Sequence, residues 1–344
     1  MTTMTLLFAF GGTGFIIWAL RPLAHQTGLV DHPGGRKNHA HPTPMVGGLG
    51  IFLGSLLAIA LLPGAIPEYK GFLALSALVL FMGTIDDVRE LNALTRLVGQ
   101  GLVGLVMALV AGVTLNSLGN IAGTDDFELG VFAVPLTVFA TVGVINAINM
   151  SDGVDGLSGG LSCVTLVLIA AAALIQGNSL HASFLAILIF ATLAFLTLNF
   201  RRPIKKSALV YLGDAGSTML GFMLAWLLID ATQGQSKMFS PVHALWFAAV
   251  PLMDTVNLLI KRPLAGHSPL RAGHDHFHHY LMRRGLSTGK TVALIIAIAI
   301  FFGLIGLAAI AYDINEQLMF TLFLATFAVY YFISGTPEEA LVSE

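Results

Sequence analysis

The chain has 344 residues, of which 56% are hydrophobic and 10% are charged, and its mean hydropathy is +0.83. A soluble globular protein carries about a quarter charged residues, so this composition excludes a water-soluble fold and indicates a polytopic membrane protein. The formal net charge of -2 is small, and its distribution is more informative than its sum. A single cysteine, Cys163, excludes an internal disulfide, and its apolar surroundings predict a buried thiol.

Apolar runs long enough to cross a bilayer, roughly 17 to 25 residues each, recur along the chain. Eleven are predicted to be membrane-spanning helices: 4–20, 46–62, 70–85, 97–115, 131–149, 157–176, 182–200, 208–230, 241–260, 291–311 and 318–333. The first run follows no positive charge and is followed directly by Arg21, so it predicts a retained helix rather than a signal peptide. The fold class is therefore all-α, with residues 1–344 forming one integral-membrane domain.

The orientation follows from the Lys and Arg residues, of which fifteen lie in loops on one face and two on the other. Basic loops stay in the cytoplasm, so the N-terminus is predicted outside and the C-terminus in the cytoplasm. A small hairpin is predicted on the outer side at residues 119–130. The cytoplasmic loops that are expected to form the site are 21–45, 86–96, 150–156, 201–207 and 261–290.

Five aspartates fall on this cytoplasmic side, namely Asp86, Asp87, Asp152, Asp155 and Asp214. A carboxylate at membrane depth costs about 2.5 to 3.5 kcal/mol, so five at one level predict a shared hydrated cavity. Taken singly, each Asp is explained equally well as a helix cap or as the partner of a nearby arginine.

Oxygen-bearing side chains surround these aspartates. Residues 146–157 place Asn146, Asn149, Asp152 and Asp155 at three-residue intervals, and Asp214 lies between glycines in Gly-Asp-Ala-Gly-Ser. Amide and carboxylate oxygens are typical ligands of Mg²⁺, which Mn²⁺ can replace. Glycines that merely allow membrane helices to pack closely are the alternative.

The same face holds nine of the eleven histidines. Orientation by positive charge explains the lysines and arginines of these loops, but it does not explain the histidines. A zinc site is disfavoured because neither cysteines nor an HExxH spacing accompany them. Imidazoles beside carboxylates and a predicted Mg²⁺ site indicate phosphoryl transfer to an acceptor that lies in the lipid.

Five motifs in this order resemble the polyprenyl-phosphate N-acetylhexosamine-1-phosphate transferases of glycosyltransferase family 4, over nearly the whole chain. They are an Asp-x-Pro-x-x-Arg-Lys-x-His loop, the Asp86-Asp87 pair, Asn-x-x-Asp-Gly-x-Asp-Gly, Gly-Asp-x-Gly-Ser, and His276-Phe277-His278-His279. The last is similar to the His-x-His-His signature of the undecaprenyl-phosphate GlcNAc-1-phosphate transferase branch. The chain departs from the family at Gly273-His274, where relatives often have Asp-Arg, and Arg271 is the nearest arginine.

The resemblance implies a role for each matching residue. Asp214 and Asn149 would hold Mg²⁺, Asp152 and Asp155 would orient the metal or the uridine, and Asp86 and Asp87 would face the lipid phosphate. Contacts to the diphosphate and the sugar would come from Arg36, Lys37, Arg96, Asn146, His274, His276, His278 and His279. A lipid phosphate with a second pKa near 6 is largely dianionic at neutral pH, so Asp86 would position it rather than deprotonate it.

The implied reaction transfers GlcNAc-1-phosphate from UDP-GlcNAc to undecaprenyl phosphate and releases UMP, at the cytoplasmic face of a bacterial inner membrane. The lipid-linked product would start a surface glycan such as the O antigen of lipopolysaccharide; no nucleic acid partner is expected, and a homodimer is left open. Another UDP-N-acetyl amino sugar or UDP-MurNAc-pentapeptide as donor stays an alternative. A proton-coupled transporter is disfavoured because such proteins place their ionisable groups near the midplane.

Two further points stay open at this stage. No serine or cysteine has a paired base, which favours a single in-line transfer, although a phospho-enzyme on Asp86 or Asp87 would make the reaction two-step. Asp254 lies about six residues inside the ninth predicted span, where it resembles an acid of the family. Its structural explanation would be a pairing with a buried polar group such as Asn257, one helical turn away.

Overall fold

The computed structural model describes residues 3–32, 42–61, 69–123, 125–200, 208–234, 237–269, 273 and 275–334. Within these ranges the chain forms thirteen α-helices, one 3-10 helix at Gly130–Phe132 and a two-stranded sheet, so the predicted all-α class is confirmed. The helices are α1 (Thr3–Thr27), α2 (Gly47–Ala60), α4 (Lys70–Arg89), α5 (Ala93–Leu109), α6 (Ala133–Met150), α7 (Leu157–Ile175), α8 (Ser179–Asn199), α9 (Gly213–Asp230), α10 (Pro241–Phe247), α11 (Ala249–Leu264), α12 (Phe277–Arg283), α13 (Thr288–Ala311) and α14 (Glu316–Ile333).

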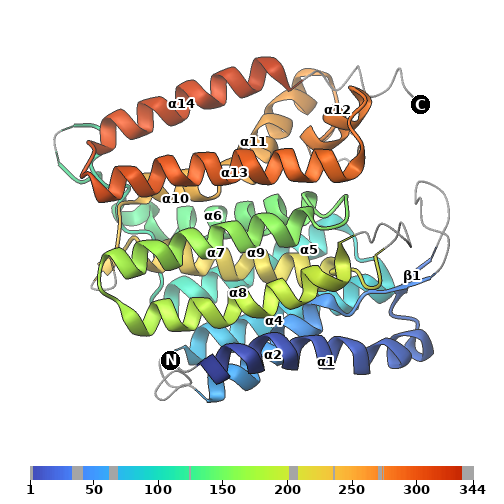
Figure 1. Cartoon of the computed structure of the whole chain (residues 1–344). Coiled ribbons are helices and arrows are strands. Elements are labelled where there is room, and N and C mark those ends of the chain that lie inside the picture. Colours follow the sequence, from blue (N-terminus) through green and yellow to red (C-terminus); the bar gives the residue numbers. More distant parts are fainter. Residues whose placement is uncertain are drawn as a thin grey trace.

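The long helices lie side by side in an elongated bundle (Figure 1). Helices α1, α8, α7 and α13 follow one another across one face, each packed against the next. Helix α9 lies in the interior, where α2, α4, α6 and α7 surround it.

Helix α9 is the centre of the core, since every residue from 215 to 229 is buried. Glycines bring its first turn against the backbones of two neighbours. A Cβ on Gly83 of α4 would lie 2.4 Å from the Cα of Ala215, and a Cβ on Gly48 of α2 would lie 2.3 Å from the Cα of Gly216. Only glycine permits such an approach, so these contacts fix the position of Asp214, which precedes Ala215.

The described residues include seven helices that are long and apolar enough to cross a membrane, or eight if the bent pair α10 and α11 is one span. Large apolar side chains on the outer helices remain exposed, as expected of groups that face lipid: Phe15 is 65% exposed, Trp18 63% and Phe332 83%. The chain is thus a multi-pass membrane protein. The predicted total of eleven spans also counts α2, α5 and α9, which fall outside this set, so that total and the orientation stay predictions.

One predicted span is wrong as a continuous helix. Residues 241–260 break at Ala248, and α10 and α11 meet there at an angle of 88°. Pro251 has no N–H to donate, and its ring clashes with the carbonyl four residues earlier, which belongs to Phe247. That carbonyl instead accepts a hydrogen bond from the hydroxyl of Thr165 on α7, at 2.9 Å. The break is therefore stabilised by a neighbouring helix.

Short extended segments close the ends of the bundle. Strands β1 (Val30–Asp31) and β2 (Thr43–Pro44) pair antiparallel, and the carbonyl of Pro44 accepts the N–H of Tyr211 at 2.8 Å. The hairpin predicted at 119–130 is present, because Ser117 pairs antiparallel with Glu128 and Phe127 donates to the carbonyl of Gly119 at 2.9 Å.

Candidate active site

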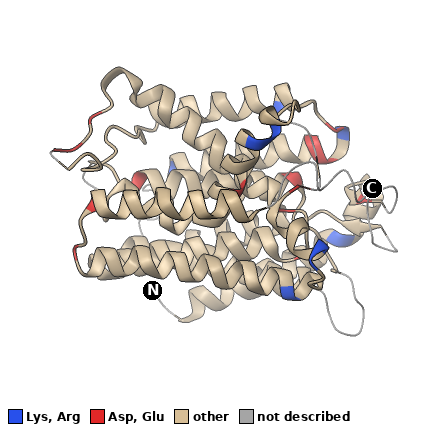
Figure 2. Cartoon of the chain, turned by 90° about the horizontal axis from the view of Figure 1, so that it is seen from above, with Lys and Arg blue, Asp and Glu red and all other residues tan. Residues whose placement is uncertain are grey.

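The predicted acidic residues converge at one end of the bundle. Asp86 and Asp87 lie in the last turn of α4, Asp214 lies in the first turn of α9, and the loop 151–156 between α6 and α7 carries the other two. Most described Lys and Arg residues also lie toward this end, on the right in Figure 2. The grouping that the sequence predicts is therefore present in the fold.

Asp87 holds the first turn of α9 in place. Its two carboxylate oxygens accept the backbone N–H groups of Asp214, at 2.7 Å, and of Ala215, at 3.1 Å. Gly213 has a φ of +74°, and a Cβ there would lie 2.6 Å from the Asp87 carboxylate. Asp87 thus acts as a helix cap supplied by a different helix, which satisfies N–H groups that the helix itself cannot pair.

Asp86 is buried and joins the acidic group to a cation. One of its oxygens accepts the backbone N–H of Leu91 at 2.8 Å, and the other faces the guanidinium of Arg96 at 3.2 Å. The same guanidinium lies 3.7 Å from the carboxylate of Asp214. Arg96 therefore bridges α4 and α9, and the structure brings it to the place where the sequence predicted an anion-binding residue.

Asn149 lies beside Asp214, as the predicted metal pair requires. Its amide nitrogen donates to the Asp214 carboxylate at 2.7 Å and to the hydroxyl of Ser217 at 2.9 Å. Because its amide nitrogen makes both of these hydrogen bonds, the amide oxygen is the Asn149 atom that could coordinate a cation. Asn146, by contrast, donates to the side chain of Gln100 at 2.7 Å, so the structure places it at the contact between α6 and α5.

The loop 151–156 is tied down by Asn199, a buried residue at the end of α8. The Asn199 amide oxygen accepts the N–H of Gly156 at 2.7 Å, and its nitrogen donates to the carbonyl of Val210 at 2.9 Å. The Asp152 side chain is open to solvent on one side, yet protein surrounds the rest of it. This partial loss of hydration, with the charges of Asp214, Asp87 and Asp155, raises the pKa of Asp152 well above its usual value. Because each of these three charges affects the pKa of Asp152, the four carboxylates interact as one electrostatic group.

The histidine motif forms the next wall of the site. Helix α12 begins at Phe277, directly after His276, and the ring of His276 stacks on that of His278, with centroids 5.6 Å apart. His279 follows at 4.2 Å from His278. A Cβ on Gly153 would lie 2.6 Å from Nε2 of His278, so the histidines pack directly against the loop that carries Asp152.

Asp254 pairs with polar groups, as its structural explanation supposes, but through other residues than the example, Asn257. Its carboxylate contacts His276, Phe277 and Tyr330, and the amide oxygen of Asn257 has no hydrogen-bond partner among the described residues. Tyr330, Gln100 and Asn199 are the residues at this end that the sequence reasoning missed. Polar residues at the ends of apolar runs were the available signal, although their partners are distant in sequence. Three predicted contact residues, Arg36, Lys37 and His274, lie outside the described ranges.

An apolar cavity of about 400 Å³ lies in the half of the bundle next to the hairpin. It is bounded by α6, α9, α10 and α11, and Phe139, Val256 and Leu259 on its wall are 69%, 42% and 40% exposed, so it opens toward the lipid. Its inner end includes Val144, which lies five residues before Asn149 on α6, or about 7 to 8 Å along the helix axis. No predicted carboxylate or histidine lines the cavity, and its lining on α9 begins at Ala225, eleven residues after Asp214.

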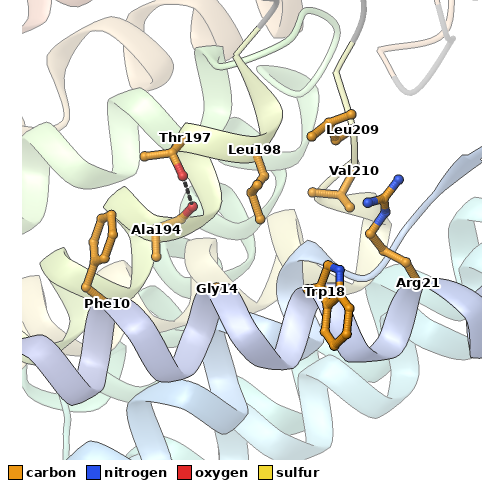
Figure 3. A pocket seen from close by; sticks show the side chains of 9 residues that line it. All are labelled: Phe10, Gly14, Trp18, Arg21, Ala194, Thr197, Leu198, Leu209 and Val210. Atoms are coloured by element: carbon orange, nitrogen blue, oxygen red, sulfur yellow. Dashed lines mark hydrogen bonds between the residues drawn. The ribbon is translucent and has the colours of Figure 1, made fainter.

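A second cavity, of about 260 Å³, lies between α1 and the end of α8 (Figure 3). Gly14 and Trp18 line it on α1, and Arg21 stands at one end. None of the predicted carboxylates or histidines lines this cavity either.

Residues 69–232, which include α4 to α9 and all five aspartates, match the model of glycosyl transferase family 4. The chain is 36% identical over 330 residues to an undecaprenyl-phosphate alpha-N-acetylglucosaminyl 1-phosphate transferase of Escherichia coli strain K12, covering 96% of this chain and 89% of that protein. Proteins of the same name from Salmonella typhimurium (37% over 326 residues, 94% and 89% covered) and Haemophilus influenzae (34% over 327 residues, 95% and 92% covered) are also similar. The chain therefore belongs to glycosyl transferase family 4, the polyprenyl-phosphate sugar-1-phosphate transferases that its motifs resemble.

Proposed function

We propose that this chain transfers GlcNAc-1-phosphate from UDP-GlcNAc to undecaprenyl phosphate, with Mg²⁺ or Mn²⁺, at the cytoplasmic face of a bacterial inner membrane. The product would be the lipid diphosphate sugar that starts a surface glycan. The relatives support the substrates, since their names specify this sugar and this lipid. The observation that carries the proposal is the charged group of Asp214, Arg96 and Asn149 at the end of the bundle where the five aspartates converge.

The oxygen atoms of this charged group fit Mg²⁺. No three His, Cys, Asp or Glu side chains form a complete metal site in the part of the chain that the structure describes. Mg²⁺ typically takes one or two protein oxygens and completes its shell with water and substrate phosphates. Asp214 and the amide oxygen of Asn149 would supply the protein ligands, and the crowded carboxylates exceed the charge that Arg96 alone neutralises. Bound there, Mg²⁺ would stabilise negative charge on the diphosphate.

The protein's own residues position the reactants. The polyprenyl chain would occupy the apolar cavity, and its phosphate would meet the guanidinium of Arg96. An oxygen of this phosphate forms a bond to the β-phosphorus of UDP-GlcNAc, and the bond between the β-phosphorus and the α–β bridging oxygen breaks, so that UMP leaves with this oxygen. The nucleophile is already ionised, so no base is needed. Asp86 and Asp87, which already accept hydrogen bonds from Arg96, Leu91 and the start of α9, act by holding these parts in place.

The test is to supply the purified protein with undecaprenyl phosphate, Mg²⁺ and one donor at a time, and to identify the lipid product by mass spectrometry. UDP-GlcNAc should yield one lipid diphosphate sugar for each UMP released, whereas UDP-GalNAc and UDP-MurNAc-pentapeptide should yield little. A product from UDP-MurNAc-pentapeptide alone would replace the donor in the proposal. Proton-coupled uptake into vesicles without any lipid product would replace the enzyme by a transporter.

A second experiment distinguishes one step from two. Labelled UMP is incubated with UDP-GlcNAc and enzyme in the absence of lipid. Transfer in a single step predicts no label in the nucleotide sugar, because UMP cannot exchange without the acceptor. Exchange would instead indicate a phospho-enzyme, with Asp86 or Asp87 as its nucleophile.

A further inference from the structure

Asp254 is a buried carboxylate, 8% exposed, in the middle of α11. One of its oxygens lies 2.8 Å from Nδ1 of His276. The other accepts the backbone N–H of Phe277 at 3.1 Å and the hydroxyl of Tyr330 at 2.7 Å. Three donors from two distant segments thus converge on one carboxylate, and both of its oxygens are used.

These contacts fix the start of the histidine helix. His276 occupies the position before α12 and makes no capping hydrogen bond with its own side chain. Asp254 replaces that cap by accepting the first N–H of the helix, while it also holds the imidazole of the preceding residue. The orientation of the ring and the position of α12 therefore depend on the same carboxylate.

Direct contacts link His276 to the loop that carries Asp152. The His276 and His278 rings are stacked with planes 8° apart, and His278 abuts Gly153 in the loop that carries Asp152. A displaced His276 would have to move His278, and with it His279. The link from Asp254 to the site is thus a chain of packed groups, each named by a contact.

Helix α11 holds the other side of the same loop two turns further on. Arg262, 3% exposed, donates to both carboxylate oxygens of Asp275, at 2.9 and 2.7 Å, and to the carbonyl of Pro269 at 3.0 Å. Burial would raise the pKa of Asp275, but the hydrogen bonds and charge of Arg262 outweigh it and hold the pKa below its usual value. The neighbouring Lys261 points elsewhere, to the carbonyl of Tyr331 at 2.6 Å and the hydroxyl of Ser334 at 3.0 Å.

We infer that Asp254 is a positioning residue for use of the nucleotide sugar: it holds His276 by Nδ1, caps α12, and so sets His278 and His279 against the Asp152 loop. Tyr330 completes the carboxylate's hydrogen bonds from the last helix. The inference rests on the proposed function in taking the histidine helix as the wall that meets the donor. It gives a reason why α11, the second half of the broken span, carries both Asp254 and Arg262 where they contact the histidine loop.

The experiment compares D254N, H276Q, the double variant D254N/H276Q and Y330F in the full-length protein, with each substrate varied in turn. D254N should lower kcat/KM for UDP-GlcNAc by about 10- to 100-fold, since small displacements of contact groups have effects of this size, and should change the KM for the lipid less than about twofold. The kcat/KM of the double variant for UDP-GlcNAc should be no lower than that of the less active single variant, because Asp254 acts through His276. Y330F removes one donor of three and should cause about a two- to fivefold loss.

Lys261→Met is the matched control. It also removes buried hydrogen bonds between α11 and α14, but it leaves the histidine loop untouched, so it should lower thermal stability without a donor-specific defect. Additive effects in the double variant, equal losses for donor and lipid, or the same donor defect in K261M would overturn the inference.

A readout that needs no turnover separates this inference from the proposed function. Diethyl pyrocarbonate modifies accessible imidazoles, and peptide mass spectrometry reports each histidine. His276 and His278 should react faster in D254N than in the wild type, and at the wild-type rate in K261M. Unchanged reactivity in both D254N and Y330F would reject the positioning role. A wild type that transfers no sugar from any UDP donor would reject the proposed function instead, whatever the histidine reactivity.

Discussion

The two ends of the helix bundle both carry polar clusters, but they use them differently. At the end formed by the start of α14, the carboxylate of Glu316 accepts the N–H of Asn120 at 2.7 Å and the hydroxyl of Ser240. Gln233 accepts the N–H of Asn116 at 3.0 Å and donates to the carbonyl of Ser117 at 3.1 Å. Three of these four contacts tie the hairpin loop to the bundle, and the one between Ser240 and Glu316 joins α14 to the residue before α10.

At the other end, carboxylates face one another. Asp86 and Asp214 share one guanidinium, and Asp152 lies in the field of Asp87, Asp155 and Asp214. Such crowding opposes folding unless a cation or a ligand relieves it, and perturbed carboxylates of this kind are concentrated at functional sites. The polar groups at the hairpin end mostly pair with the backbone, whereas the carboxylates at the other end also repel one another, as expected of the proposed active site.

The sharpest way to break this comparison is to neutralise one carboxylate at each end. Asp214→Asn should lower kcat by about 10³-fold or more, because removal of a metal ligand takes away several kcal/mol of transition-state stabilisation. Glu316→Gln should keep activity within about twofold and lower the melting temperature by about 2 to 4 °C. Turnover assays at saturating Mg²⁺ and thermal melting measure both. Asp214→Asn with most of its activity would remove this residue from the metal.

The cations at the two ends allow a second test. Arg96→Met should reduce kcat/KM by about 100-fold, since it removes the guanidinium that would face the phosphates and leaves Asp86 and Asp214 without their partner. Arg96→Lys should recover part of the loss. Lys237→Met removes an exposed pair with Asp126, 3.8 Å long, at the other end, and should change nothing measurable. Equal effects of Arg96→Met and Lys237→Met would show that the distinction between the ends is mistaken.

A histidine substitution should affect one substrate only. His279→Ala is expected to raise the KM for UDP-GlcNAc about tenfold through the loss of a hydrogen bond to a charged group, while the KM for the lipid stays unchanged. His25, exposed in the last turn of α1, is the control, and His25→Ala should leave both constants alone. An unaltered KM and rate for the donor in His279→Ala would mean that the histidines only build the loop.

The smallest effect concerns the two cavities. Gly143 lines the large cavity and Gly14 lines the small one, and a Cβ at either position meets no atom within 4 Å. Gly143→Leu should therefore fold normally and fill part of the lipid-facing cavity. It should raise the KM for undecaprenyl phosphate about fivefold, because the isoprenoid can then bury less of its apolar surface there. Gly14→Leu should leave this KM unchanged. Kinetics with the lipid varied at saturating donor decide between these outcomes.

Much of the fold could be predicted because membrane helices appear in the sequence as long apolar runs, and each predicted run overlaps at least one helix in the structure. The break in the ninth run could not be predicted in the same way. A proline near the start of a helix is tolerated, and the hydroxyl that accommodates this break comes from Thr165, 82 positions away from Phe247. The residues near the break do not indicate a partner so distant in the sequence.

The candidate site shows the same division. The gathering of Asp86, Asp87 and Asp214 follows from charge and topology, and it could be predicted before any contact was known. The cap that Asp87 places on α9 depends on where two helices cross, which composition does not encode. The structural explanation of Asp254 gave Asn257, one turn away, as an example of a polar partner, yet the observed partners lie 22 to 76 positions along the chain.

The bend at Ala248 has a consequence for how the proposed lipid substrate would move between the bilayer and the protein. Helices α10 and α11, which meet at 88°, border the apolar cavity together with α6, and the exposed side chains of Phe139 and Val256 lie on its wall. A long isoprenoid can then enter and depart sideways, without its hydrocarbon leaving the oily phase, which would cost about 0.8 kcal/mol for each methylene exposed to water. In the proposed reaction the water-soluble nucleotide would reach the carboxylates from the aqueous side, so the two substrates would not share an entrance.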